Sequence, residues 1–110
     1  MKRKLANTIP TASTLTTLYT VPTLCDGAKC TLRVLNPSAN IAAVRVAFAA
    51  TDTPTNSEYI DKDVSIPING GSYEINDINL GPGEKVVIWS DQATTAFRLE
   101  GELLVDNSHI

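Results

Sequence analysis

The sequence predicts an all-β fold: an antiparallel β-sandwich of about seven strands, of jelly-roll or immunoglobulin-like type, with an extended N-terminal arm. Three observations predict it. Apolar and polar residues alternate along short segments, Gly, Pro and Asn turns separate these segments, and no run of ten residues keeps helical spacing. The length of 110 residues is usual for one domain. We therefore expect an arm over residues 1–14 and a single sandwich domain over residues 15–110.

The expected arm is basic at its tip. Residues 1–14 are rich in Thr, Ala and Pro and have no apolar period. Lys2, Arg3 and Lys4 are three of the nine bases, so the rest of the chain holds six bases against twelve acids. Opposite charges across an interface steer assembly and fix its register. We expect the arm to leave the sandwich and lie on an adjacent subunit, with its tip near carboxylates.

The first three strands follow from alternation and from the turns that end them. Residues 15–21 (LTTLYTV) form the first predicted strand, which Pro22 closes. The second strand alternates over residues 29–35 up to the turn at Asn36-Pro37. Residues 42–49 alternate in the third, and a loop containing Pro54 is expected after it, over residues 51–57.

The later strands have special positions as well as alternation. Residues 64–68 form a fourth strand, and Pro67 marks it as a sheet edge because proline cannot donate a ladder hydrogen bond. After the Gly70-Gly71 turn, a fifth strand over residues 73–80 is expected to bulge near Asp77. The sixth and seventh strands are residues 86–89 (VVIW), after the Gly81-Pro82-Gly83 turn, and residues from Phe97 toward Val105.

Two of these strands are apolar on both faces. Val87 and Trp89 point away from Val86 and Ile88, and the small residues Ala43, Ala47 and Ala49 lie opposite the larger side chains of their strand, broken only by Arg45. A strand that is apolar on both sides is typical of burial on both sides. We therefore expect Ala43, Arg45, Ala47, Val87 and Trp89, together with the basic tip, to form an interface with other subunits.

The two cysteines lie in the segment CDGAKC. Asp26-Gly27 is a turn signal, so a short hairpin would make Cys25 and Cys30 a facing pair and a possible disulfide. The alternative is that both are small, partly buried apolar residues.

Catalytic and metal chemistry have little support, and we expect neither an enzyme nor a cofactor. The one histidine, His109, stands near the end of the sequence, where a positioned imidazole is not expected. Asp61 with Asp63, and Glu100 with Glu102, form pairs on one strand face each, which favours solvated faces over two-carboxylate hydrolysis. Asp61-Lys62-Asp63 lacks the further oxygen ligands of a calcium loop.

Charge and apolarity also limit the partners. The net charge is −3 at pH 7, so we expect no nucleic acid partner. Residues 5–10 are too polar for a signal peptide, and no run approaches the roughly eighteen apolar residues of a transmembrane helix. A glycan-binding module remains the alternative, with stacking aromatic residues Tyr19, Tyr59, Tyr73 and Trp89.

The segment LTTLYTVPTLCDGAKCTLRVLNPSANIAAVRVAFA resembles a group of small β-sandwich virion proteins of tailed bacteriophages. The shared pattern is a Leu-Tyr-x-Val-Pro start, an apolar strand ending in Asn, and a V-R-V-A strand; residues 58–60 and 83–87 also match, and the resemblance covers roughly residues 15–101. It implies a multi-copy structural protein of the head, tail or fibre, made in the host cytoplasm and located in the virion. The implied partners are capsid or tail subunits and copies of the chain itself. The arm, the cysteines and residues 102–110 depart from the pattern.

Overall fold

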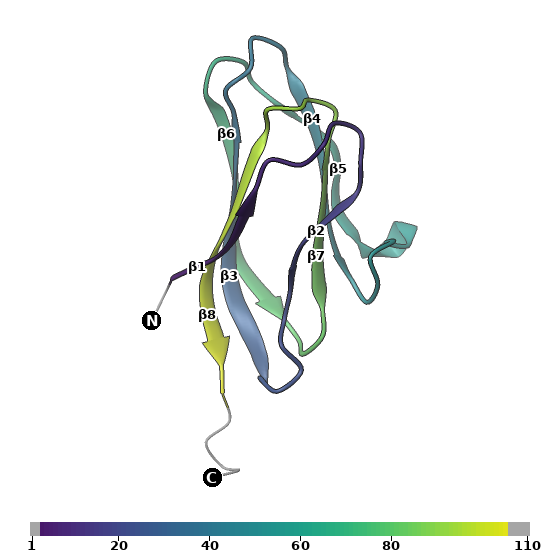
Figure 1. Ribbon diagram of the computed structural model, residues 1–110, viewed down its shortest axis with the longest axis vertical. Helices are drawn as coiled ribbons and strands as arrows, with labels where there is room; N and C mark the ends of the chain where they lie inside the picture. Colours follow the sequence, from purple (N-terminus) through teal and green to yellow (C-terminus); the bar gives the residue numbers. More distant parts are fainter. Residues whose placement is uncertain (1–2, 106–110) are drawn as a thin grey trace.

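The computed structural model describes residues 3–105 and confirms the antiparallel β-sandwich. The elements, in chain order, are β1 (Arg3–Thr8), β2 (Thr16–Thr20), β3 (Gly27–Asn36), β4 (Ala42–Ala49), the short 3-10 helix η1 (Asn56–Glu58), β5 (Tyr59–Ile66), β6 (Gly71–Leu80), β7 (Lys85–Ser90) and β8 (Ala96–Leu104). Two four-stranded sheets face each other, sheet A in the order β1-β8-β3-β6 and sheet B in the order β2-β7-β4-β5 (Figure 1). Within residues 3–105, no helix is long and apolar enough to span a membrane.

One apolar core lies between the two sheets. The alternation along each strand sends one set of side chains inward, as predicted, because successive residues of a strand point to opposite faces. The largest fully buried side chains include Phe97, Leu32, Ile66, Ile88 and Leu99. They come from both sheets and belong to one cluster, so burial of these side chains is the main stabilising term of the fold.

The prediction of an arm that leaves the sandwich is wrong for Arg3–Thr8, which forms strand β1. Arg3–Thr8 is extended, but it pairs antiparallel with β8 of its own chain instead of leaving the sandwich. Lys4 lies opposite Glu100, so a carboxylate near the basic tip is supplied by the same sheet. Strand pairing rests on backbone hydrogen bonds, which need no apolar period in the added strand. Lys2 lies outside the described residues.

Two positional predictions about the strands are confirmed. Strand β5 stops at Ile66, directly before Pro67, and occupies the edge of sheet B. In β6, Asp77 adopts a positive φ of 58°, and the register with β3 shifts there, as a bulge requires. Strand β5 begins earlier than predicted, at Tyr59, because the charged residues that open it hide its alternation.

All four edge strands are irregular. Each of β1, β2, β5 and β6 meets its neighbour with a register shift. Bulges bend an edge and interrupt its row of free backbone groups, which discourages the addition of a foreign strand. The faces and the ends of the sandwich are therefore better candidates for contact than its edges.

A hydrogen bond joins the two sheets where β5 and β6 lie at neighbouring edges. The Tyr73 hydroxyl of sheet A donates to the Asp61 carboxylate of sheet B. Burial, and next the hydrogen bond to Asp61, raise the pKa of Tyr73 to about 12. Because this pKa lies above the ordinary value near 10, the folded state disfavours the phenolate.

This hydrogen bond predicts a loss of stability at alkaline pH. The contribution of Tyr73 should be complete below pH 10 and should fade as the pH rises toward about 12. Tyr73→Phe should lower the free energy of unfolding by about 1 kcal/mol at pH 8. Urea unfolding at pH 8 and pH 11 measures both effects. A wild-type advantage that stays constant between the two pH values would contradict this prediction.

Candidate interaction surfaces

The outer face of sheet B carries the strand residues that the sequence predicted as an interface. Ala43, Arg45 and Ala47 alternate with the core residues of β4 and share its outer face. The register places Arg45 opposite Trp89 and Ala47 opposite Val87 of β7. The structure therefore brings these five residues together on one surface.

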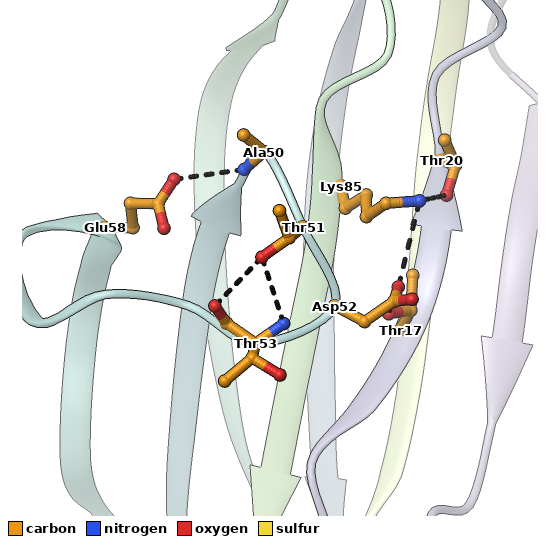
Figure 2. A network of polar contacts seen from close by, with 8 residues as sticks. All are labelled: Thr17, Thr20, Ala50, Thr51, Asp52, Thr53, Glu58 and Lys85. Atoms are coloured by element: carbon orange, nitrogen blue, oxygen red, sulfur yellow. Dashed lines mark hydrogen bonds and ion pairs between the residues drawn. The ribbon is translucent and has the colours of Figure 1, made fainter.

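Part of this surface is already covered by the chain itself. Ala47 is 0% exposed and Val87 1% exposed, and they form a second apolar cluster with Ala49, against which Tyr59 packs. The β4–β5 connection, residues 50–58, crosses this side of the sheet in front of β7 (Figure 2); we call it the strap. The expectation that Ala47 and Val87 bind a partner is corrected, because both are buried within the chain itself, where Tyr59 of β5 packs against their cluster.

Asp52 fastens the strap to the two strands beneath it. Thr17 Oγ1 of β2 donates to Asp52 Oδ1 at 2.5 Å. Lys85 Nζ of β7 lies 3.8 Å from the same oxygen and also donates to Thr20 Oγ1 at 3.1 Å. Figure 2 shows these groups converging from the loop and both strands. The strap therefore spans from β4 across β7 to β2.

Glu58 closes the strap at its base. Its two carboxylate oxygens accept the backbone N–H groups of Thr55 at 2.9 Å and Ala50 at 3.0 Å. These backbone hydrogen bonds, from Thr55 first and then Ala50, lower the pKa of Glu58. The carboxylate is therefore ionised at neutral pH and holds the two ends of the connection together.

The rest of the outer face is occupied by Arg45. Its guanidinium lies over the Trp89 ring, 4.1 Å from the centroid, and Nε is 2.7 Å from Asp63 Oδ1. A cation stacked on an indole in this way shields the ring and is attracted to its face. Ala43 is half-buried beside them.

We predict that Asp52→Ala loosens the strap without unfolding the sandwich. Both contacts of Asp52 are exposed, so the loss of free energy of unfolding should stay below about 1 kcal/mol. Hydrogen exchange of residues 50–57 should increase, because the connection loses the contacts that hold it to β2 and β7. Thr53→Ala is the control, since Thr53 contributes backbone groups to the strap's contacts. Equal exchange in the two variants would refute the role of Asp52.

The outer face of sheet A is polar and cross-linked by charge. Arg33 of β3 lies opposite Arg98 of β8, and Glu100 has Oε1 within 3.3 Å of the Nε of each. Glu74 of β6 lies 3.3 Å from Arg33. The positive charges of Arg33 and Arg98 are thus paired with carboxylates. Because these ion pairs are exposed to solvent, they contribute little to stability.

A groove of about 540 Å³ lies beside these charges, where β1, β3, β6 and β8 meet the connections of one end. Ile9 and Leu35 line it and are 60% and 43% exposed. The groove therefore joins the charged face of sheet A to an apolar end of the sandwich.

That end of the sandwich is apolar and almost free of charge. We call it the loop end, made of the connections 9–15, 37–41, 67–70 and 91–95 together with Leu35. Five of its large apolar side chains are exposed: Ile9, Leu15, Leu35, Ile41 and Ile68. Asp91 is the one charged residue in these four connections, and its carboxylate accepts the Ala43 N–H at 2.9 Å. Figure 1 shows the four connections in the upper part of the molecule, with 37–41 and 67–70 at the top.

The loop end is tied together by hydrogen bonds. The buried Asn36 amide donates to the carbonyl oxygens of Asn40, Ile66 and Pro67, at 2.9, 3.2 and 3.1 Å, and its oxygen accepts the Ser38 N–H at 3.1 Å. Backbone bonds also join Asn69 to Ser38 and Ser13 to Ser90. These hydrogen bonds hold the connections 37–41 and 67–70 together and tie the connection 9–15 to the end of β7, so the loop end forms a platform.

The opposite end is acidic. Its connections, residues 21–26, 50–58 and 81–84, hold the carboxylates of Asp26, Asp52, Glu58 and Glu84 and no base. Among the connections of residues 3–105, one end therefore holds four acids, of which Asp52 is paired with Lys85, and the other end holds Asp91 alone.

The predicted cysteine hairpin is wrong. Strands β2 and β3 belong to different sheets, so residues 21–26 cross between sheets, with a turn in which the Cys25 N–H donates to Pro22 O. Cys30 instead faces Ile78 and Gly101 on its two neighbouring strands. Both thiols are free, and burial raises the pKa of Cys30 to about 11, which keeps it protonated and unreactive.

The candidate acids are dispersed over the fold. Asp61 accepts from Tyr73 and Asp63 pairs with Arg45, both on sheet B, whereas Glu100 and Glu102 lie on β8 of sheet A. Within residues 3–105, no group of three His, Cys, Asp or Glu side chains is placed to hold a metal ion. The prediction about His109 concerns a residue outside the described range.

Comparison with models of protein families, with curated proteins and with solved structures gave no match for this chain. Sequence reasoning missed the loop end as a surface. A signal for it was present, since Ile9, Ile41 and Ile68 each stand next to a Pro or Asn residue, which favours turns. Large apolar residues in turns have no strand face to bury them.

Proposed function

We propose that this chain is a structural protein of a tailed-bacteriophage particle, which stabilises the particle by binding neighbouring capsid or tail subunits. The observation that carries the proposal is the loop end, where Ile9, Leu15, Leu35, Ile41 and Ile68 are exposed on a platform fixed by hydrogen bonds. Clustered exposed apolar side chains favour contact with another protein surface.

Binding through such a platform fits a stabilising role. Covering apolar side chains removes their surface from water, and a partner that binds only the folded chain stabilises it by mass action. The platform needs little ordering on contact, because Asn36 already joins two of its connections, residues 37–41 and 67–70. The affinity lost to ordering is therefore small.

The phage context comes from the resemblance over residues 15–101. Its V-R-V-A segment lies in β4, where Val44 and Val46 are core residues, and its Leu-Tyr-x-Val-Pro segment begins in β2. The shared pattern thus concerns the framework of the sandwich. Of the loop end, which we propose as a contact surface, the connection 37–41 lies between these two framework segments.

Glycan binding receives less support from the geometry. Arg45 lies over the Trp89 ring, Tyr59 packs on the second apolar cluster, and the Tyr73 hydroxyl bonds to Asp61. A sugar ring stacks on a free aromatic face, and these faces or hydroxyls are engaged within the chain.

The test follows the chain through particle purification. Lysates of the host strain that carries the gene are separated on a density gradient, and the fractions are analysed by mass spectrometry. We expect the chain to migrate with particles at a constant ratio to their coat protein. Recovery only among free soluble proteins, or binding to a host glycan array without particle association, would overturn the proposal.

A further inference from the structure

We propose that the loop end is a self-association surface, through which two copies of this chain pack end to end about a twofold axis. The inference rests on the proposed function only in treating the chain as an assembly subunit. It adds the occupant of the loop end, which is a second copy of this chain as the neighbouring subunit.

The charge distribution selects this surface and this occupant. A twofold contact brings each patch against its own copy, so any charge near the axis faces a like charge. The loop end has Asp91 as its one charge, and that carboxylate is bound to the Ala43 N–H. The opposite end presents Asp26 and Glu84, together with Asp52, whose carboxylate lies 3.8 Å from Lys85 Nζ of β7. Two copies of a chain with net charge −3 therefore approach with least repulsion through their loop ends.

The apolar side chains are placed to meet across such a contact. Ile41 and Ile68 belong to the β3–β4 and β5–β6 connections, which are joined by the bond from Asn69 N–H to Ser38 O at 2.8 Å. Ile41 is 61% exposed and Ile68 44% exposed. Their burial against a second copy removes apolar surface from water without stranding any charge.

The area of the end sets the strength of the contact. The two shorter dimensions of the molecule are 29 and 19 Å, so an end face projects to no more than about 550 Å², below the roughly 800 Å² per partner of a standard interface. The dimer should therefore be weak and in rapid exchange. Such a contact becomes effective when many copies are held close together.

The experiment measures self-association of the full chain. Sedimentation equilibrium over a wide concentration range should show a reversible monomer–dimer equilibrium for the wild type. Ile41→Lys with Ile68→Lys should raise the dissociation constant more than about tenfold, because buried apolar area is replaced by facing charges. Leu24→Lys is the matched control: Leu24 is 96% exposed in the β2–β3 connection at the other end, and this variant should associate like the wild type.

Further measurements separate a loss of self-association from a loss of folding. NMR shifts on dilution should change for residues 37–41 and 67–70, and higher salt should maintain or strengthen association, since it screens the net charge. Circular dichroism confirms that each variant is folded. A wild type that stays monomeric throughout, or a dimer that Leu24→Lys disrupts equally, would overturn the inference. Particle association of a strictly monomeric wild type would leave the proposed function intact while this inference fails.

Discussion

Gly101→Ala is expected to lower the free energy of unfolding by about 3 kcal/mol, near the upper end of the usual cost of overpacking. A Cβ at position 101 would lie 2.1 Å from Lys29 O and 2.8 Å from Cys30 Cα. Both atoms belong to the backbone of β3, which cannot move aside as a side chain does. Strand β8 would have to separate from β3 in the middle of sheet A.

Gly81→Ala provides the matched control for this prediction. A Cβ at position 81 would meet only Glu84 Oε1, at 3.8 Å, which is ordinary contact. We expect its effect to stay within about 0.5 kcal/mol. Urea unfolding followed by the fluorescence of Trp89, the one tryptophan of the chain, measures both variants. Equal unfolding midpoints for the two alanine variants would show that β8 does not pack on β3 as described.

The second large effect is expected for Asn36→Leu. The substitution leaves the carbonyl oxygens of Asn40, Ile66 and Pro67 and the Ser38 N–H without the side chain that binds them. Position 36 is 0% exposed, so water does not readily replace the lost partners. Each unsatisfied buried group costs about 1–3 kcal/mol, and because such losses are not additive we expect about 3 kcal/mol in all.

This substitution should also have a local signature. Hydrogen exchange of residues 37–41 and 67–70 should accelerate more than that of the core strands, because Asn36 joins these two connections. Asn40→Ala is the control, since Asn36 binds the backbone carbonyl of Asn40 and alanine keeps it. If Asn40→Ala destabilises the chain as much as Asn36→Leu, the buried amide is not the group that holds the loop end.

Much of the candidate surface on sheet B was predictable from residue order. Alternation alone puts Ala43, Arg45 and Ala47 on one side of their strand and Val87 and Trp89 on one side of theirs. The structure confirms that the two sets lie side by side. Sequence reasoning failed on what buries Ala47 and Val87, because nothing local indicates that Tyr59, which follows the polar connection 50–58, packs back against β4 and β7.

The cysteine prediction failed for a related reason. A turn signal such as Asp26-Gly27 reports that the chain changes direction, and a hairpin is only one way of doing so. Here the turn belongs to a segment that passes from sheet B to sheet A, which places Cys30 beside Ile78 and Gly101. Whether a connection returns along its own sheet or crosses to the other one is decided by global packing.

The sequence by itself determined the fold class, the inward face of most strands, the edge at Pro67 and the bulge at Asp77. These features follow from interactions between residues close in sequence: side-chain alternation, the missing proline N–H and turn conformations. Only the tertiary structure decided that β1 pairs with β8, that Tyr59 packs against Ala47 and Val87, and that five apolar side chains are exposed at one end. Each of these joins segments distant in sequence, and backbone pairing and loop packing of this kind depend on the path of the whole chain.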